Sequence, residues 1–128
     1  MGFSATPSEA LGSLEPLLSG VRREMDLAIR SDQPGLQELV PLVAHFQGKM
    51  LRPALTLSCA ELCGADPKSN AARVLSATVE LIHISTLVHD DVLDEADLRR
   101  NTPTINALEG NEAAVILGDW LIASSFRL

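Results

Sequence analysis

Residues 69–95 read SNAARVLSATVELIHISTLVHDDVLDE, and this stretch decides the fold. It contains neither glycine nor proline, and its apolar residues recur at the three- and four-residue intervals of an α-helix. No strand-like alternation occurs elsewhere in the chain, and aromatic residues, which favour sheets, make up only 3% of it. We therefore expect one long helix here within an all-α helical bundle.

The polar residues of this helix fall on one side. At about 100° per residue, Glu80, His83, Asp90, Asp91 and Asp94 lie within an arc of about 100°. A solvated helix face would mix such acids with lysines, and carboxylates late in a helix oppose its macrodipole. We therefore expect this polar stripe to line a cavity between helices rather than to face bulk water.

The three aspartates predict a magnesium site. Carboxylates on an apolar helix are costly unless they are paired or bound to metal. Mg²⁺ takes one or two carboxylates and completes its shell with water and substrate phosphate. Arg99 and Arg100 follow closely and suit that phosphate. A solvated acidic face is the alternative, and the histidine on the same side, together with the paired arginines, favours the metal-diphosphate site.

A second anion site is predicted at Gly48-Lys49-Met50-Leu51-Arg52-Pro53. Two cations precede a helix that begins near Pro53, and backbone amides at a helix N-terminus favour anions. Alone this is a weak signal, because charged loops are common. Beside the aspartate helix, it predicts one diphosphate held through metal and another held directly by cations.

Four further helices are expected around the long one. The expected segments run from after Pro7 to about Arg30, over residues 36–47, from near Pro53 to Gly64, and from about Glu112 to the end. The net charge of −7 argues against a nucleic-acid partner. Two lone cysteines and the absence of a signal pattern predict a cytoplasmic protein with reduced thiols. The length of 128 residues fits one domain.

An HD-type metal phosphohydrolase is a different enzyme class to consider, because His89 and Asp90 form an HD pair. His89, however, lies about 180° around the helix from Glu80, away from the polar stripe. A shared metal with Asp94 is therefore not expected.

The motifs together resemble those of the trans-isoprenyl diphosphate synthases, or polyprenyl synthetases. The resemblance covers residues 48–119, and the order and spacing of five short motifs make it specific. The motifs are Gly48-Lys49-x-x-Arg52-Pro53, Glu80-x-x-His83, His89-Asp90-Asp91-x-x-Asp94, Arg99-Arg100 with Pro103-Thr104, and Gly118-Asp119.

The resemblance implies the N-terminal half of the isoprenoid synthase fold and a Mg²⁺-dependent prenyl transfer. An allylic diphosphate would ionise, and its cation would add to isopentenyl diphosphate. Four residues are implied at the allylic diphosphate: Asp90, Asp91 and Asp94 as metal ligands, and Arg99. Four others are implied to bind isopentenyl diphosphate: Lys49, Arg52, His83 and Arg100.

Product length is implied to depend on Ser85 and Thr86, one turn before the first aspartate. Short-chain members of the family carry aromatic rings there, so these small residues predict a product longer than farnesyl. The alternative is that both residues serve only helix packing.

The sequence also departs from the family pattern. No second aspartate-rich motif occurs within residues 1–128, and Asn101 replaces the glycine that usually follows the arginines. We expect residues 1–128 to form a single partial domain that needs a second protein subunit carrying the other motif, in a hetero-oligomer. The alternatives are a truncated full-length synthase and a non-catalytic regulatory subunit. The 128 residues alone are expected to be nearly inactive and to associate through their last helix.

Overall fold

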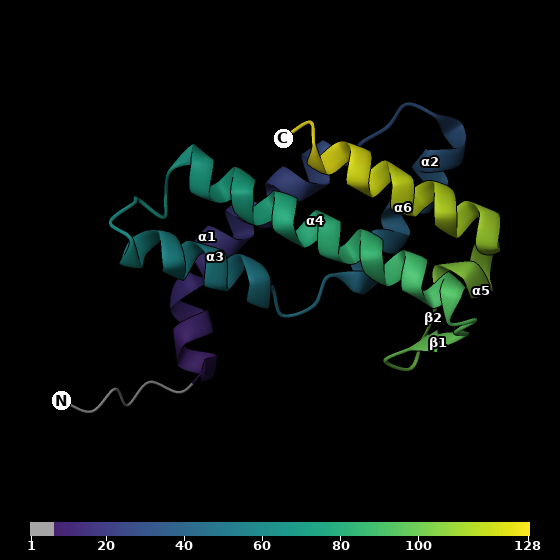
Figure 1. The fold of residues 1–128 in the computed structure, drawn as a ribbon, viewed down its shortest axis with the longest axis horizontal. Coiled ribbons are helices and arrows are strands. Elements are labelled where there is room, and N and C mark those ends of the chain that lie inside the picture. Colours follow the sequence, from purple (N-terminus) through teal and green to yellow (C-terminus); the bar gives the residue numbers. More distant parts are fainter. Residues whose placement is uncertain (1–6) are drawn as a thin grey trace.

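The fold is an all-α assembly, seen in a computed structural model that describes residues 7–128, with side chains from residue 12 onward except His45 (Figure 1). This confirms the predicted class. Its elements are α1 (Pro7–Ala28), α2 (Pro34–Leu39), the 3₁₀ helix η1 (Val40–Phe46), α3 (Leu51–Leu62), α4 (Asn70–Leu93), β1 (Leu98–Arg99), β2 (Thr102–Pro103), α5 (Ile105–Glu109) and α6 (Asn111–Ser125).

Helix α4 is the centre of the bundle and corresponds to the long helix expected from the sequence. Ser69 caps it, because the Ser69 hydroxyl accepts a hydrogen bond from the Ala72 amide at 3.2 Å. The helix packs against α1, α3 and α6. The fully buried side chains that join these helices include Leu18, Val21, Met25, Leu57, Leu81, Ile84, Val88, Leu117 and Leu121.

Among the described residues, α4 is also the one helix long and apolar enough to cross a membrane by those two measures alone. The central helix of a water-soluble bundle meets the same criterion. Its packing against three other helices accounts for its apolar composition.

The second expected helix is divided in two. The α-helical part, α2, ends at Leu39, and the chain continues as the 3₁₀ helix η1 with Pro41 in its first turn. Proline has no amide hydrogen to donate and disfavours an α-helical turn before it, so the α-helix ends there.

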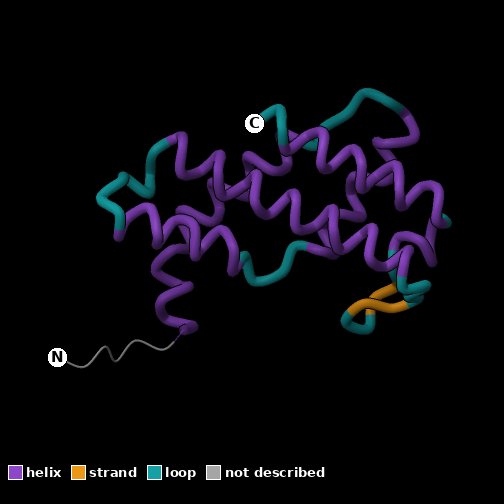
Figure 2. Tube along the Cα trace, viewed as in Figure 1, coloured by secondary structure: helices purple, strands orange, loops and turns teal. Residues whose placement is uncertain are grey.

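A short β-hairpin after α4 was not predicted (Figure 2). Strands β1 and β2 pair antiparallel, with Arg99 opposite Thr102. The two residues between these partners, Arg100 and Asn101, have φ angles of 51° and 63°, the left-handed pair that tight two-residue hairpin turns require. Asn101, which stands where the family pattern has glycine, adopts the left-handed conformation that asparagine tolerates. Each strand has only two residues, too few for an alternating pattern to reveal it.

Helices α4 and α6 approach closely at Gly118. A Cβ atom added there would lie 2.1 Å from Nε2 of His89. The His89 ring also lies 3.2 Å from the Val115 carbonyl oxygen and 3.5 Å from a carboxylate oxygen of Asp119. His89 therefore faces α6, away from the polar stripe, as its position on the helical wheel predicts.

We expect Gly118→Ala to lower the free energy of unfolding by about 1–3 kcal/mol, because the new methyl group overlaps the His89 ring. Urea unfolding followed by circular dichroism measures this. The matched control is Gly35→Ala in α2, where an added Cβ meets no atom within 4 Å. Equal stability of both variants would contradict the close approach of the two helices.

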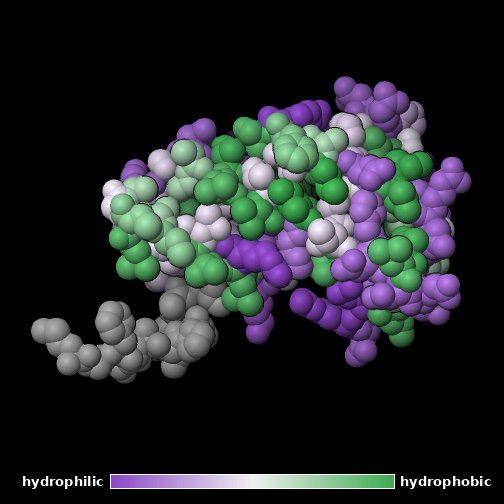
Figure 3. Space-filling view, viewed as in Figure 1, coloured by the Kyte–Doolittle hydropathy of each residue, from purple (hydrophilic) through white to green (hydrophobic). Residues whose placement is uncertain are grey.

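One face of the bundle exposes apolar side chains. Leu55 and Leu62 on α3 and Leu75 and Ile82 on α4 are exposed, and Leu62 retains 87% of its accessible surface. Figure 3 shows hydrophobic surface over this face of the molecule. Phe126 at the end of α6 is also 80% exposed. Exposed apolar side chains that lie together are typical of surfaces that contact another protein, a membrane or a ligand.

Candidate functional site

The central carboxylate of the aspartate cluster is buried and bound by an arginine. Asp91 is 2% exposed, and its two carboxylate oxygens accept hydrogen bonds from Arg99 Nε at 3.0 Å each. Arg99 Nη2 adds a third bond to Oδ1 at 2.7 Å. These bonds to Asp91 raise the pKa of Arg99, and the charges of Asp90 and Asp94 raise it further. The bidentate ion pair between Arg99 and Asp91 thus joins the hairpin to α4.

The other two aspartates are open. Asp90 and Asp94 are exposed, one turn apart on the last turns of α4, and neither carboxylate has a hydrogen bond or ion pair within the described residues. No three acidic, histidine or cysteine side chains converge into a metal site in this part of the chain. Of the three predicted metal ligands, two are therefore available and the third is engaged by Arg99. Two carboxylates suit Mg²⁺, which fills its remaining positions with water and phosphate oxygens.

The predicted cationic loop lies beside the hairpin. Nη1 of Arg100 would be 3.2 Å from a Cβ atom added at Gly48, so the guanidinium rests against the loop backbone. The loop turns sharply at Met50, whose φ is 55°, and α3 then carries Arg52 in its first turn. Arg52 and Arg100 are exposed, with no side-chain hydrogen bond or ion pair among the described residues. The structure therefore brings together two cationic segments that are about 50 residues apart in sequence.

His83 lies close to these cations. Burial lowers its pKa, and the positive charges of Arg52, Arg99 and Arg100 lower it further. The imidazole is therefore neutral at pH 7 and can donate one hydrogen bond and accept another. Arg52, Arg99 and Arg100 are therefore close enough to His83 for their charges to act on it.

This arrangement makes stability depend on pH through His83. Its pKa is 6.5 when unperturbed and lower in the folded protein, so the unfolded chain binds more protons between these two values. The free energy of unfolding is expected to fall as the pH decreases from 7 through this window. In His83→Gln the part of this pH dependence that comes from His83 should be absent. Urea unfolding between pH 5 and 8 measures the free energy of unfolding of both proteins. Identical pH profiles for both proteins would count against a depressed His83 pKa.

The two predicted chain-length residues have different environments. Ser85 is fully buried between α4 and α6, where its hydroxyl donates to the Gly118 carbonyl oxygen at 2.8 Å. Thr86 is exposed, and its hydroxyl donates to the His83 carbonyl oxygen within the helix. Only Thr86 therefore presents its side chain to an open face.

Glu80 is a member of the stripe to which the sequence assigned no role. Glu80 is 4% exposed, and its Oε2 is buried without a hydrogen-bond partner among the described residues. Burial raises its pKa, while the charge of Arg52 acts in the opposite direction. The Glu80-x-x-His83 spacing was the available signal, but the sequence could not show that the carboxylate is buried.

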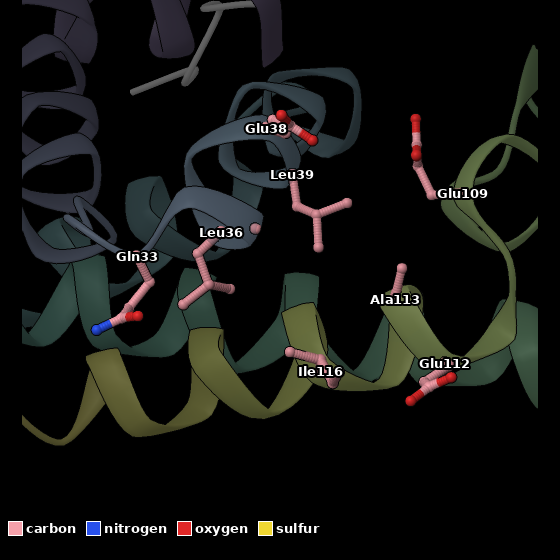
Figure 4. A pocket seen from close by; sticks show the side chains of 9 residues that line it. Gln33, Leu36, Glu38, Leu39, Glu109, Glu112, Ala113 and Ile116 are labelled. Carbon is pink, nitrogen blue, oxygen red and sulfur yellow. The ribbon is translucent and has the colours of Figure 1, made fainter.

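A cavity lies apart from these residues. It has a volume of about 520 Å³ and lies between α2 on one side and α5 and α6 on the other (Figure 4). Leu36, Leu39, Ala113 and Ile116 give it an apolar lining, and three glutamates lie around it. It contains none of the residues of the aspartate cluster or of the cationic loop.

Comparison with known proteins gives a family match. The family model described as polyprenyl synthetase matches residues 33–128. The chain is 38% identical to nonaprenyl diphosphate synthase of Mycobacterium tuberculosis over 84% of this chain and 32% of that protein. It is 37% identical to heptaprenyl diphosphate synthase component 2 of Bacillus subtilis over 84% of this chain and 30% of that protein.

Solved structures show the same fold. A polyprenyl synthase from Caulobacter crescentus, complexed with calcium and isoprenyl diphosphate, superposes with a TM-score of 0.86 and 33% identity. The superposition covers 99% of this chain and 38% of that one. The chain thus spans about a third of the length of the curated relatives quoted above.

Proposed function

Because the chain belongs to the polyprenyl synthetase family, we propose that it forms the part of a trans-prenyl diphosphate synthase that binds the allylic diphosphate. The observation that carries this proposal is the end of α4, where two open carboxylates flank an aspartate that holds an arginine. Residues 1–128 then constitute one partial domain of the enzyme.

The allylic diphosphate would be held at this end of α4. Asp90 and Asp94 are the carboxylates available to hold Mg²⁺, which when bound neutralises charge on a diphosphate leaving group. Asp91 fixes the orientation of Arg99, and the guanidinium edge left free by Asp91 can donate to a phosphate oxygen. Asp91 thereby contributes to the site through Arg99.

Isopentenyl diphosphate would be held by Lys49, Arg52, Arg100 and neutral His83. Arg52 and Arg100 are exposed and free of side-chain partners within the described residues, so no ion pair must break when an anion arrives. The neutral imidazole adds a hydrogen bond without a charge of its own. The binding of this diphosphate would not require metal.

The reaction proposed is a prenyl transfer. The allylic carbon–oxygen bond breaks, inorganic diphosphate leaves, and the isopentenyl double bond attacks the allylic cation before a proton is lost. Arg99 stabilises negative charge on the leaving group, and the second cationic site positions the isopentenyl group. Prenyl transfer to isopentenyl diphosphate is therefore the function that these residues support best.

We propose a product longer than farnesyl. Thr86 is small and exposed on the face of α4 next to His83. No aromatic side chain at this position therefore blocks the space into which a growing prenyl chain would extend. The quoted relatives are named as nonaprenyl and heptaprenyl synthases, which supports the proposal. Ser85 would contribute indirectly, through the packing of α4 on α6.

The remaining metal ligands would come from polypeptide outside residues 1–128. This is either a continuation of the same chain or a second subunit; a relative in Bacillus subtilis is named component 2 of its synthase. The exposed apolar face of α3 and α4 provides a surface for that polypeptide. A regulatory, non-catalytic subunit would not need two open carboxylates beside an oriented arginine.

We also propose that the enzyme is located in the cytoplasm.

Titration with inorganic diphosphate, followed by calorimetry with and without Mg²⁺, tests the two-site proposal. We expect Arg52→Ala to weaken metal-free binding by about tenfold or more, since one charged contact contributes roughly 1.5–3 kcal/mol. Asp90→Asn should leave metal-free binding unchanged and reduce the additional binding seen with Mg²⁺. Absence of metal-free binding to the unmodified protein would contradict the second anion site.

A further inference from the structure

Glu80 is a buried glutamate on α4 whose carboxylate has no hydrogen-bond partner and no ion pair among the described residues. It lies one turn before His83 on the polar stripe, and only 4% of its surface is exposed. Neither carboxylate oxygen has a hydrogen-bond partner among the described residues, and Oε2 is fully shielded from solvent. A buried carboxylate in this state destabilises a protein, so its position calls for a positive partner.

The candidate partner is on the neighbouring helix. Helices α3 and α4 pack together, and Arg52 in the first turn of α3 is close enough for its charge to act on Glu80. Arg52 itself has no side-chain hydrogen bond or ion pair within the described part of the chain. Within the described residues, Glu80 thus has no hydrogen-bond donor and the Arg52 side chain has no acceptor.

Arginine can bind two anions at once. Its planar guanidinium presents five N–H donors, so one edge can bind a carboxylate while another binds a phosphate oxygen. An inner carboxylate would hold the long side chain in one orientation and reduce the entropy lost when the phosphate binds. Aspartate and arginine already make such a pair at Asp91 and Arg99, on the other side of His83.

We propose that Glu80 is a positioning residue that holds Arg52 toward the diphosphate of isopentenyl diphosphate, with the guanidinium bridging carboxylate and phosphate. The proposal rests on the function proposed above and extends it by one residue. Glu80 and Arg52 would then parallel Asp91 and Arg99, so that each of the two diphosphates meets an arginine held by a carboxylate of α4.

The opposing effect is electrostatic. A negative charge near the site repels diphosphate, so removing it without loss of orientation would strengthen binding. The two effects have opposite signs, and measured affinity therefore decides between them.

The experiment is a double-mutant cycle on the affinity for inorganic diphosphate, measured by calorimetry without Mg²⁺ and with a chelator. Glu80→Met removes the acceptor and keeps an unbranched side chain of similar length that suits a buried position. We expect it to weaken binding about tenfold, and Glu80→Gln, which retains a carbonyl acceptor, to weaken it less. In the Arg52→Ala background, Glu80→Met should have no further effect, because its contribution acts through Arg52.

Melting temperatures and a matched control variant test whether the Glu80 variants keep their structure. Because burial disfavours the charged carboxylate, Glu80→Met and Glu80→Gln should melt at or above the temperature of the unmodified protein at pH 8. Glu61→Gln, an exposed glutamate on α3, is the control and should bind diphosphate normally.

Three results separate the two proposals. Unchanged or tighter binding by Glu80→Met, while Arg52→Ala binds weakly, would overturn the role of Glu80 alone. Additive effects of Glu80→Met and Arg52→Ala would overturn it as well, because Glu80 would then act independently of Arg52. Normal binding by Arg52→Ala would overturn the second anion site itself, and with it the positioning role.

Discussion

Arg99→Ala is expected to lower the free energy of unfolding by about 2–4 kcal/mol, because it leaves the Asp91 carboxylate buried and unpaired. Asp91 is only 2% exposed, and Arg99 supplies all three of its side-chain hydrogen bonds in the described structure. The Arg99 side chain is 32% exposed, so solvent screens part of the interaction, and the lower part of the range for buried pairs applies. Urea unfolding at pH 7 measures the change.

The neighbouring arginine is a matched control. Arg100 is exposed and has no side-chain partner within the described residues, so Arg100→Ala should change stability by less than about 0.5 kcal/mol. Replacing both Asp91 and Arg99 with leucine should recover much of the loss, since no unpaired charge then remains. If Arg99→Ala were as stable as Arg100→Ala, the ion pair would not join the hairpin to α4 in solution.

The fold was largely predictable because local signals determine its main helices. The periodicity of residues 69–95 predicts α4, and Ser69 and Gly64 mark helix ends that the structure confirms. Gly64 has a φ of 81°, and the amides of Gly64 and Ala65 bond back to Glu61 and Ala60, the pattern of a left-handed helix cap. The hairpin and α5 were missed because segments of two to five residues carry no periodicity.

The site was only partly predictable. Helical geometry places Asp90, Asp91 and Asp94 on one side, but it cannot show which carboxylate an arginine engages. That depends on the hairpin, which turns Arg99 back toward α4. Similarly, Ser85 and Thr86 are adjacent in sequence, and only the packing of α6 shows that Ser85 is buried. The sequence therefore identifies which residues belong to the candidate site, whereas tertiary contacts determine the environment of each side chain.

In the synthase proposed above, Asp90→Asn is expected to reduce prenyl transfer by about 10³-fold, because metal stabilisation of leaving-group charge contributes several kcal/mol. Asp90 is one of two open carboxylates at the end of α4, and the amide removes the charge while keeping the shape. Incorporation of labelled isopentenyl diphosphate at saturating substrate measures the rate. Raising the Mg²⁺ concentration should restore part of it, because the lost ligand weakens metal binding.

Three companion variants test whether this effect arises at the metal. Asp94→Asn should behave like Asp90→Asn, since the two open carboxylates lie one turn apart on α4. Asp97→Asn replaces an exposed acid beyond the helix end and should retain nearly full activity. Asp91→Asn should also lose activity, but it should lower stability and respond little to added Mg²⁺, because Asp91 acts through Arg99.

Near-normal turnover by Asp90→Asn at limiting Mg²⁺ would remove Asp90 from the metal site. A rescue of Asp91→Asn by Mg²⁺ as strong as that of Asp90→Asn would instead make Asp91 a ligand, and Arg99 would then have to release it when the metal binds.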